Sequence, residues 1–271
     1  MTVLGYHLRM SPRDGRVLAP TTADQRAFAR AVLGAVGACP VLAFRAADSH
    51  LHLVAVCSRP AAGKLAWRMA RALRSRLRLP TPFDPPHFEP VRDQRHLYNA
   101  FRYVLRQDDR HDLLLDPWAE ASNLPDLLGL RLLGRNTATC VARCLPRIRP
   151  EELAARLGVT LDQLLRAPLP ESAFEHLADA AAAAAALPSL HGRDLETVAC
   201  RCAAVHLGSS QLSARRLAAA LDTSVSTIRR RRRQLPDPGL VEAVARQLRL
   251  RTYGAPRGRT QERQGLGTSQ A

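Results

Sequence analysis

The chain of 271 residues is strongly basic, with 40 Lys and Arg against 24 Asp and Glu, a formal net charge of +16 and a pI near 11.1. Almost all of the positive charge is arginine, since Lys64 is the only lysine. A genome rich in G and C would explain arginine in place of lysine, but not the excess of positive over negative charge. The planar guanidinium group suits bidentate contacts to phosphate, so nucleic acid is the expected partner.

The same sequence argues against a secreted or membrane protein. Charged residues interrupt Met1–Leu18, so no secretory signal is expected, and no apolar run reaches the roughly 18 residues needed to span a membrane. The six cysteines lack the spacing of a disulfide framework or of a common zinc site. We therefore expect reduced thiols, no membrane partner and a cytoplasmic, nucleoid-associated protein.

Strand and helix patterns alternate in the N-terminal part of the chain. Alternating or continuous apolar runs predict the strands, and apolar residues three and four apart predict the helices. In chain order we expect a strand at Val3–Met10, a helix from Thr21 or Thr22 to Val36, strands at Pro40–Arg45 and His50–Cys57, a helix at Ala61–Leu77, a short strand near His87–Val91 and a helix at Asp93–Asp108. This order predicts an α+β fold, a ferredoxin-like antiparallel sheet with helices on one face.

Strand signals stop beyond about Leu115, so we expect an all-α C-terminal region. The expected helices are Leu124–Leu133, Thr137–Cys144, Pro150–Leu165, Ser172–Ala186, Asp194–His206, Ser213–Leu221 and Ser224–Gln234. The run Ala180–Ala186 has high helix propensity but little side chain to pack, which favours a helical connector. After Tyr253 the chain is rich in Gly, Arg and Gln and is expected to be disordered.

Two short motifs carry candidate catalytic chemistry. Side chains alternate along a strand, so His50 and His52 should project from one face while Leu51 enters the core. Tyr103 and Gln107 are one turn apart on the predicted helix and should share a face. Two imidazoles and a nearby amide oxygen can hold a divalent ion, and a tyrosine beside that amide could attack a phosphate polarised by the ion.

A second tyrosine, Tyr98, competes with Tyr103 for the role of nucleophile. It lies five residues away, about 140° around the helix, towards Phe101 and Leu105. We therefore expect Tyr98 to be a core residue.

A helix-turn-helix is predicted at Ser213–Arg230. Leu217 and Ala218 would pack its first helix, and Asp222 occupies the turn position usually filled by glycine. A plain two-helix hairpin with a solvated basic face is the alternative interpretation. The arginine run favours DNA binding, with expected contacts from Ser224, Ser226, Thr227, Arg229, Arg230, Arg231, Arg232 and Arg233.

The His50-Leu51-His52 motif followed by Tyr103-x-x-x-Gln107 resembles that of the single-tyrosine HUH transposases, the insertion-sequence family that includes the REP-associated tyrosine transposases. The resemblance extends to the order of elements and to the segment Asp116–Trp118, and covers about the first 120 residues. Some REP-associated members also carry a C-terminal helix-turn-helix. The resemblance implies a ferredoxin-like catalytic domain at 1–120, to which we add a helical connector region at 121–190, a helix-turn-helix DNA-binding unit at 191–250 and a disordered basic tail at 251–271.

The resemblance also implies an activity. Such a protein is a metal-dependent DNA transposase and endonuclease that cleaves and rejoins hairpin-bearing single-stranded DNA through a 5′-phosphotyrosine intermediate. Tyr103 would be the nucleophile, and Mg²⁺ or Mn²⁺ would be held by His50, His52 and Gln107. We expect the DNA backbone to be held by Arg102, Arg106 and Arg110, with duplex DNA as a second ligand of the helix-turn-helix.

Two other functions remain open. The main alternative is a domesticated DNA-binding regulator with a vestigial nuclease site. A replication initiator or relaxase would use the same chemistry, but relaxases usually have a tyrosine before the histidine pair and often a third histidine. The sequence leaves open whether the chain forms a homodimer.

Overall fold

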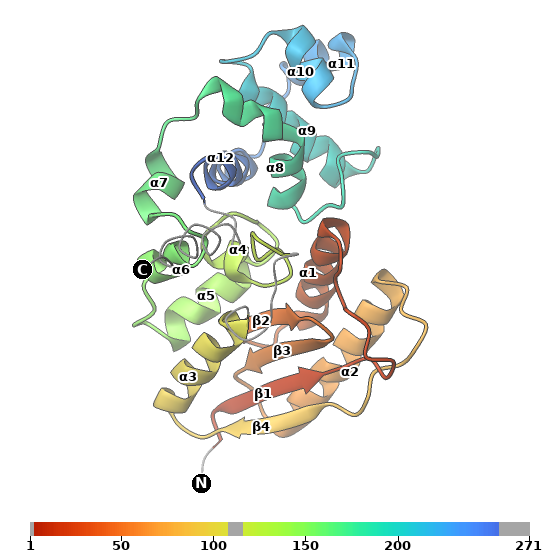
Figure 1. Cartoon of the computed structure of the whole chain (residues 1–271), viewed down its shortest axis with the longest axis vertical. Coiled ribbons are helices and arrows are strands. Elements are labelled where there is room, and N and C mark those ends of the chain that lie inside the picture. Colours follow the sequence, from red (N-terminus) through yellow and green to blue (C-terminus); the bar gives the residue numbers. More distant parts are fainter. Residues whose placement is uncertain (1–2, 108–115, 255–271) are drawn as a thin grey trace, which may run out of the picture.

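The computed structural model describes residues 3–107 and 116–254 and has an α+β fold (Figure 1). Four strands, β1 (Gly5–Met10), β2 (Val41–Ala47), β3 (His50–Ala55) and β4 (His87–Val91), form an antiparallel sheet in the order β2-β3-β1-β4. β2 extends two residues further than predicted, so the turn to β3 is only Asp48 and Ser49, with Asp48 at φ +56°. Across the described residues, none of the helices combines the length and apolar character that a bilayer crossing requires.

One face of the sheet is covered by α1 (Thr22–Val36) and α2 (Arg59–Arg76). Thr21 caps α1 by accepting a hydrogen bond from the backbone N–H of Asp24, as its position before the helix predicts. The helices pack on alternate residues of the strands, which form the first apolar core with them, including Leu8, Met10, Leu51 and Leu53.

The other face of the sheet is covered by α3 (Gln94–Leu105), so the expectation of helices on one face was wrong. Leu42 and Val54 point to this second face and pack with Leu97 and Phe101 of α3. β2 is buried along its whole length, because both layers of helices cover it. Its nearly continuous run of apolar residues, without alternation, is typical of a strand that is covered on both faces.

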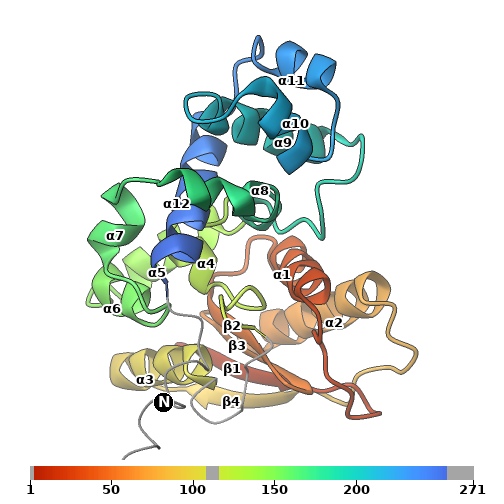
Figure 2. The same ribbon diagram turned by 45° about the horizontal axis from the view of Figure 1, so that its top comes forward.

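After α3, every described element with regular structure is helical. In chain order they are α4 (Leu124–Leu127), α5 (Arg135–Cys144), α6 (Pro150–Ala155), α7 (Leu161–Arg166), the 3₁₀ helix η2 (Glu171–His176), α8 (Leu177–Ala184), α9 (Leu195–Gly208), α10 (Ala214–Ala220), α11 (Val225–Arg231) and α12 (Pro238–Tyr253). Figure 2 shows that α10 and α11 lie at the end of the molecule farthest from the sheet. Arg251–Tyr253, assigned to the tail by the sequence, belong to α12.

The alanine run is part of a core rather than a connector, which corrects the sequence interpretation. Ala180–Ala184 are fully buried in α8, where α9 and α12 pack against them. Small side chains let neighbouring helices approach closely, so the absence of bulk that suggested a connector is what permits this packing. The apolar core built on α8 also crosses the expected boundary between residues 190 and 191.

A network of four charged side chains, of which those of Arg26, Glu120 and Arg251 are buried and that of Asp179 is half exposed, ties α1 beneath the sheet to the C-terminal helices. Arg26 of α1 and Arg251 of α12 both pair with Glu120 and with Asp179 of α8. Burial alone would raise the pKa of Asp179, but Arg251 and Arg26 hold it below its ordinary value. The network joins residues up to 225 positions apart, from Arg26 to Arg251, so the N-terminal and C-terminal parts stabilise each other.

Candidate active site and nucleic-acid interface

Three histidine rings lie together on the sheet face that α3 covers. Alternation along β3 directs Leu51 to the opposite core and leaves His50 and His52 on this face, with ring centroids 4.7 Å apart. His7 of the adjacent strand β1 stacks on His52 with a centroid distance of 5.2 Å. His52 is only 3% exposed, so this is a largely desolvated part of the sheet surface.

Tyr103 of α3, the helix that covers this face of the sheet, contacts the three histidines. Its ring makes edge contacts with the rings of His7 and His52, both at a centroid distance of 5.6 Å. Asp93 caps the start of α3 by accepting from the backbone N–H of His96, which helps to fix the helix over the sheet. The two motifs singled out in the sequence, about fifty residues apart, are therefore adjacent in space.

The sequence interpretation missed His7. Its side chain belongs to the alternate set of β1 that faces α3, and the register pairs it with Val54. Alternation in Val3–Met10 could have predicted the side of the sheet on which His7 lies. It could not have predicted that His7 lies beside His52, because the sequence does not say which strands pair.

A chain of two hydrogen bonds links Glu89 of β4 to His52 through His7. Glu89 Oε2 lies 3.3 Å from His7 Nδ1, and His7 Nε2 lies 3.0 Å from His52 Nδ1. Burial lowers the pKa of His7 below its ordinary value, although Glu89 opposes the shift, so we treat the ring as neutral.

The tautomers follow from this arrangement. A carboxylate only accepts, so His7 donates from Nδ1 and accepts at Nε2, and His52 must donate from Nδ1. The lone pair of His52 then lies on Nε2, a nitrogen that can bind a metal ion. Metal-binding histidines typically donate a hydrogen bond from the ring nitrogen that does not bind the metal, and this bond fixes their tautomer.

Gln107 lies beyond the end of α3, which corrects the expectation of one helix through Asp108. The helix ends at Leu105, and the side chain of Gln107 folds back so that its Nε2 donates to the backbone carbonyl of Tyr103 at 3.1 Å. This bond partly caps the end of the helix. Gln107 is 1% exposed, and within the described residues its buried Oε1 accepts no hydrogen bond.

A buried amide oxygen without a donor is costly unless another ligand satisfies it. Within residues 3–107 and 116–254, no group of three His, Cys, Asp or Glu side chains is placed to hold a metal ion. The structure brings His50 and His52 together, and the contact that it gives for the expected third ligand, Gln107, is with the Tyr103 carbonyl. The donor set of imidazole and amide suits Mn²⁺ or Mg²⁺ with water and also softer ions.

The expected arginine contacts along α3 have different surroundings. Arg102 lies over the ring of Tyr98, and its Nη1 donates to the Tyr98 hydroxyl at 3.2 Å. Arg106 is exposed at the end of the helix. Arg110 lies outside the described residues.

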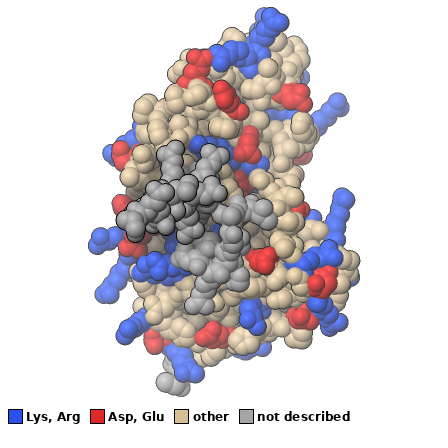
Figure 3. Space-filling model, in the orientation of Figure 1, with Lys and Arg blue, Asp and Glu red and all other residues tan. Residues whose placement is uncertain are grey.

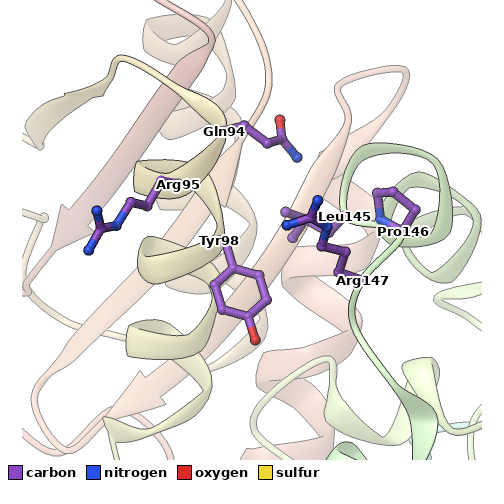
Figure 4. A pocket seen from close by; sticks show the side chains of 6 residues that line it. All are labelled: Gln94, Arg95, Tyr98, Leu145, Pro146 and Arg147. Carbon is purple, nitrogen blue, oxygen red and sulfur yellow. The ribbon is translucent and has the colours of Figure 1, made fainter.

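Tyr98 packs against the edge of the apolar core rather than inside it, so the expectation of a core residue holds only in part. It is half-buried and lines a pocket of about 670 Å³ between α3 and the segment that follows α5 (Figure 4). Phe101 and Leu105 do enter the core. The ring of Tyr98 faces the edge of their cluster because α5 and α6, which the sequence could not position, leave a gap there.

At the far end of the molecule, α10 and α11 are joined by a tight turn at Asp222. Its φ of +46° is the left-handed conformation expected at this position. Ser213 caps α10 and Ser224 caps α11, each accepting from the backbone N–H three residues on. The Ser224 hydroxyl also lies 2.8 Å from the Ser226 hydroxyl and 2.9 Å from the Thr227 hydroxyl, so these side chains order the start of α11.

The five arginines at the end of α11 divide into two groups. Arg231 donates to Gln234 Oε1 at 2.7 Å, and Arg232 donates to Ser209 Oγ and to the carbonyl of Leu212. The other three, Arg229, Arg230 and Arg233, are exposed and make no side-chain bond or ion pair with the described part of the chain. Figure 3 shows positive side chains projecting from this end.

Comparison of the chain with models of known families, with curated proteins and with solved structures gave no match.

Proposed function

We propose that this chain is a metal-dependent single-tyrosine DNA transposase and endonuclease that cleaves and rejoins hairpin-bearing single-stranded DNA. The observation that carries the proposal is the contact between the Tyr103 ring and His52, within a group that also contains His50 and His7. A single nucleophile beside a pair of imidazoles is the set of groups that such a reaction needs. The order β2-β3-β1-β4 and the succession of strands and helices support a ferredoxin-like arrangement for the catalytic part.

The residues present fit Mg²⁺ or Mn²⁺. His50, His52 and Gln107 Oε1 would hold the ion, and the unsatisfied Oε1 is the observation that favours this. When bound, the ion supplies Lewis-acid polarisation of the scissile phosphate. His7 and Glu89 act as positioning residues, since they direct the lone pair of His52 to Nε2.

Tyr103 performs the covalent step. Its phenol oxygen forms a bond to the phosphorus of the scissile phosphate, and the bond from phosphorus to the 3′ oxygen breaks. The phenol proton leaves to water, and the departing 3′ oxygen takes up a proton. One phosphate ester replaces another, so the reverse reaction rejoins the strand without a nucleotide cofactor.

The helix-turn-helix at α10 and α11 supplies a second DNA contact, to duplex. The exposed Arg229, Arg230 and Arg233 support this, because exposed guanidinium groups can neutralise the backbone phosphates of duplex DNA. Two sites at opposite ends of the molecule would let one chain hold a duplex flank while it cleaves a single strand (Figure 2). A nucleoid-associated, cytoplasmic location follows from this proposal, and a homodimer would be compatible with it.

The second candidate is a DNA-binding regulator that retains α10 and α11 but no longer cleaves. The same exposed arginines favour it. Incubating the protein with labelled hairpin single strands and Mn²⁺, then searching for a covalent adduct under denaturing conditions, distinguishes the two. An adduct at Tyr103 supports the transposase, and duplex binding without any adduct supports the regulator.

A further inference from the structure

A groove runs along the outer side of α3, away from the histidines. Its first part is the pocket of about 670 Å³ lined by Gln94, Arg95, Tyr98, Leu145, Pro146 and Arg147 (Figure 4). Its second part is a pocket of about 440 Å³ whose lining includes Arg102, Arg106, Ile148 and Arg156. The lining residues of the two parts follow one another along both α3 and the segment after α5, and Arg102 of the second part donates to the hydroxyl of Tyr98 in the first.

We infer that this groove binds the single-stranded DNA that flanks the cleavage position, with Tyr98 as a stacking platform for a base. The inference rests on the proposed function and adds the route that the single-stranded DNA takes over the protein surface. Proteins that bind single strands combine aromatic side chains, on which bases stack, with a positively charged groove that follows the backbone.

The chemistry of the lining favours this ligand. Five arginines, Arg95, Arg102, Arg106, Arg147 and Arg156, line the two parts of the groove, against one carboxylate, Glu152. The floor at Tyr98, Leu145 and Pro146 is apolar and suits the face of a base. A polyanion with flat apolar groups matches both features, whereas an apolar protein segment would match only the second.

The groove is also in the right place relative to Tyr103. Successive residues of a helix are about 100° apart, so Arg102 and Tyr103 lie on neighbouring flanks of α3. The exposed Asn99 and Arg106 lie between these two flanks. A DNA strand that leaves the groove at Arg102 would pass over Asn99 and Arg106 and reach Tyr103 and the histidines.

Figure 4 shows how the side chains of the first part lie. Tyr98 extends from α3 and Arg147 comes from the opposite wall, after α5, while Arg95 points away from both, towards the other side of the helix. Arg95 and Arg147 are exposed, so their substitution should leave the fold unchanged.

The test uses the full chain with Tyr103→Phe, so that binding is measured without a covalent step. Affinity for a labelled single strand of mixed sequence is measured by fluorescence anisotropy over a range of salt. Tyr98→Ala should weaken binding roughly 5- to 150-fold, while Tyr98→Phe, which keeps the ring, should bind like the parent. Circular dichroism checks that Tyr98→Ala is folded, and the pair with Phe separates stacking from the loss of the hydroxyl.

The salt dependence tests the arginines. Arg95→Gln with Arg147→Gln should reduce the salt slope by about 0.7 for each phosphate that the protein no longer neutralises. The matched control is Arg74→Gln with Arg76→Gln, two exposed arginines of α2 on the opposite face of the sheet, which should leave affinity and slope unchanged. Duplex affinity should be unchanged in all of these variants.

Photocrosslinking gives a direct readout. A single strand carrying 5-iododeoxyuridine should crosslink to the tryptic peptide 96–102, which contains Tyr98. Crosslinks confined to other peptides, or an equal fall in affinity with the control arginines, would overturn the inference. Adduct formation is assayed separately, on the chain with Tyr103 intact. If the groove variants bind poorly and the chain with Tyr103 intact forms no adduct, the groove stands and the proposed transposase fails. If that chain forms an adduct and the groove variants bind like their parent, the transposase stands and the groove fails.

Discussion

The ring of Tyr103, on α3, meets the ring of His52, on β3, edge to face, with centroids 5.6 Å apart and planes at 83°. This contact joins a helix to a strand across the second face of the sheet. It brings the candidate nucleophile to the histidine whose tautomer is set by His7. The predictions below test the parts of this arrangement separately.

Tyr103→Phe should bind hairpin DNA like the parent and yield no protein–DNA adduct, because only the reacting oxygen is removed. Tyr98→Phe is the matched control on the same helix and should still form the adduct. Denaturing gels and peptide mapping measure both. An adduct mapped to Tyr98 would contradict the assignment.

His50→Ala and His52→Ala should each abolish cleavage and lower the affinity for Mn²⁺, since two imidazoles are needed to hold the ion. Titration calorimetry measures the metal, and hairpin binding should be retained. His52 is 3% exposed, so circular dichroism must show that its variant is folded. Parental cleavage by folded His52→Ala would refute the metal site.

His7→Ala should weaken Mn²⁺ binding by about 10- to 100-fold, the usual effect of removing the partner that orients a metal-binding histidine. The control is His96→Ala, because His96 Nε2 lies 3.9 Å from the same carboxylate, Glu89, whereas the ring that stacks on His52 is that of His7. This control should bind the metal like the parent. Equal effects of the two substitutions would mean that His7 has no special role in orienting His52.

Replacing Arg229, Arg230 and Arg233 with Gln should weaken duplex binding and lower the salt slope by about 0.9 for each phosphate that is no longer neutralised, without loss of stability. Arg232→Gln should instead lower the free energy of unfolding by about 0.5–1.5 kcal/mol, because it breaks solvent-accessible bonds to Ser209 and Leu212. Anisotropy and chemical denaturation separate the two effects. Unchanged duplex affinity in the triple variant would argue for a solvated basic face.

Arg26→Gln should reduce the free energy of unfolding by about 3–5 kcal/mol, because it removes one partner from a largely buried ion network. Arg13→Gln is the control, since its pair with Asp84 is exposed and should contribute about 0–1 kcal/mol. Urea denaturation measures both. Similar losses in the two variants would mean that the network contributes little to joining the two layers.

The packing of the C-terminal helices limits how their role in DNA binding can be tested. Deleting everything from Gly192 would remove α9 and α12, which cover α8, together with Arg251 of the ion network. Point substitutions on α11 are therefore the appropriate test of DNA binding.

Local patterns in the sequence were sufficient for several features. Alternation placed His50 and His52 opposite Leu51, the caps at Thr21 and Asp93 marked helix starts, and the turn at Asp222 adopts the left-handed conformation expected there. Each depends on neighbours in the chain, so the physical cause is readable from a few residues.

Tertiary structure decided the rest. The burial of α8, the covering of the sheet on both faces, the contact of His7 with His52 and the groove at Tyr98 all depend on which elements pack together. Propensity and periodicity describe one segment at a time, whereas these features join segments that lie far apart in the chain. The roles of the alanine run in α8 and of His7 in β1 cannot be predicted from the neighbouring sequence, because each role depends on the element that packs beside it in the folded chain.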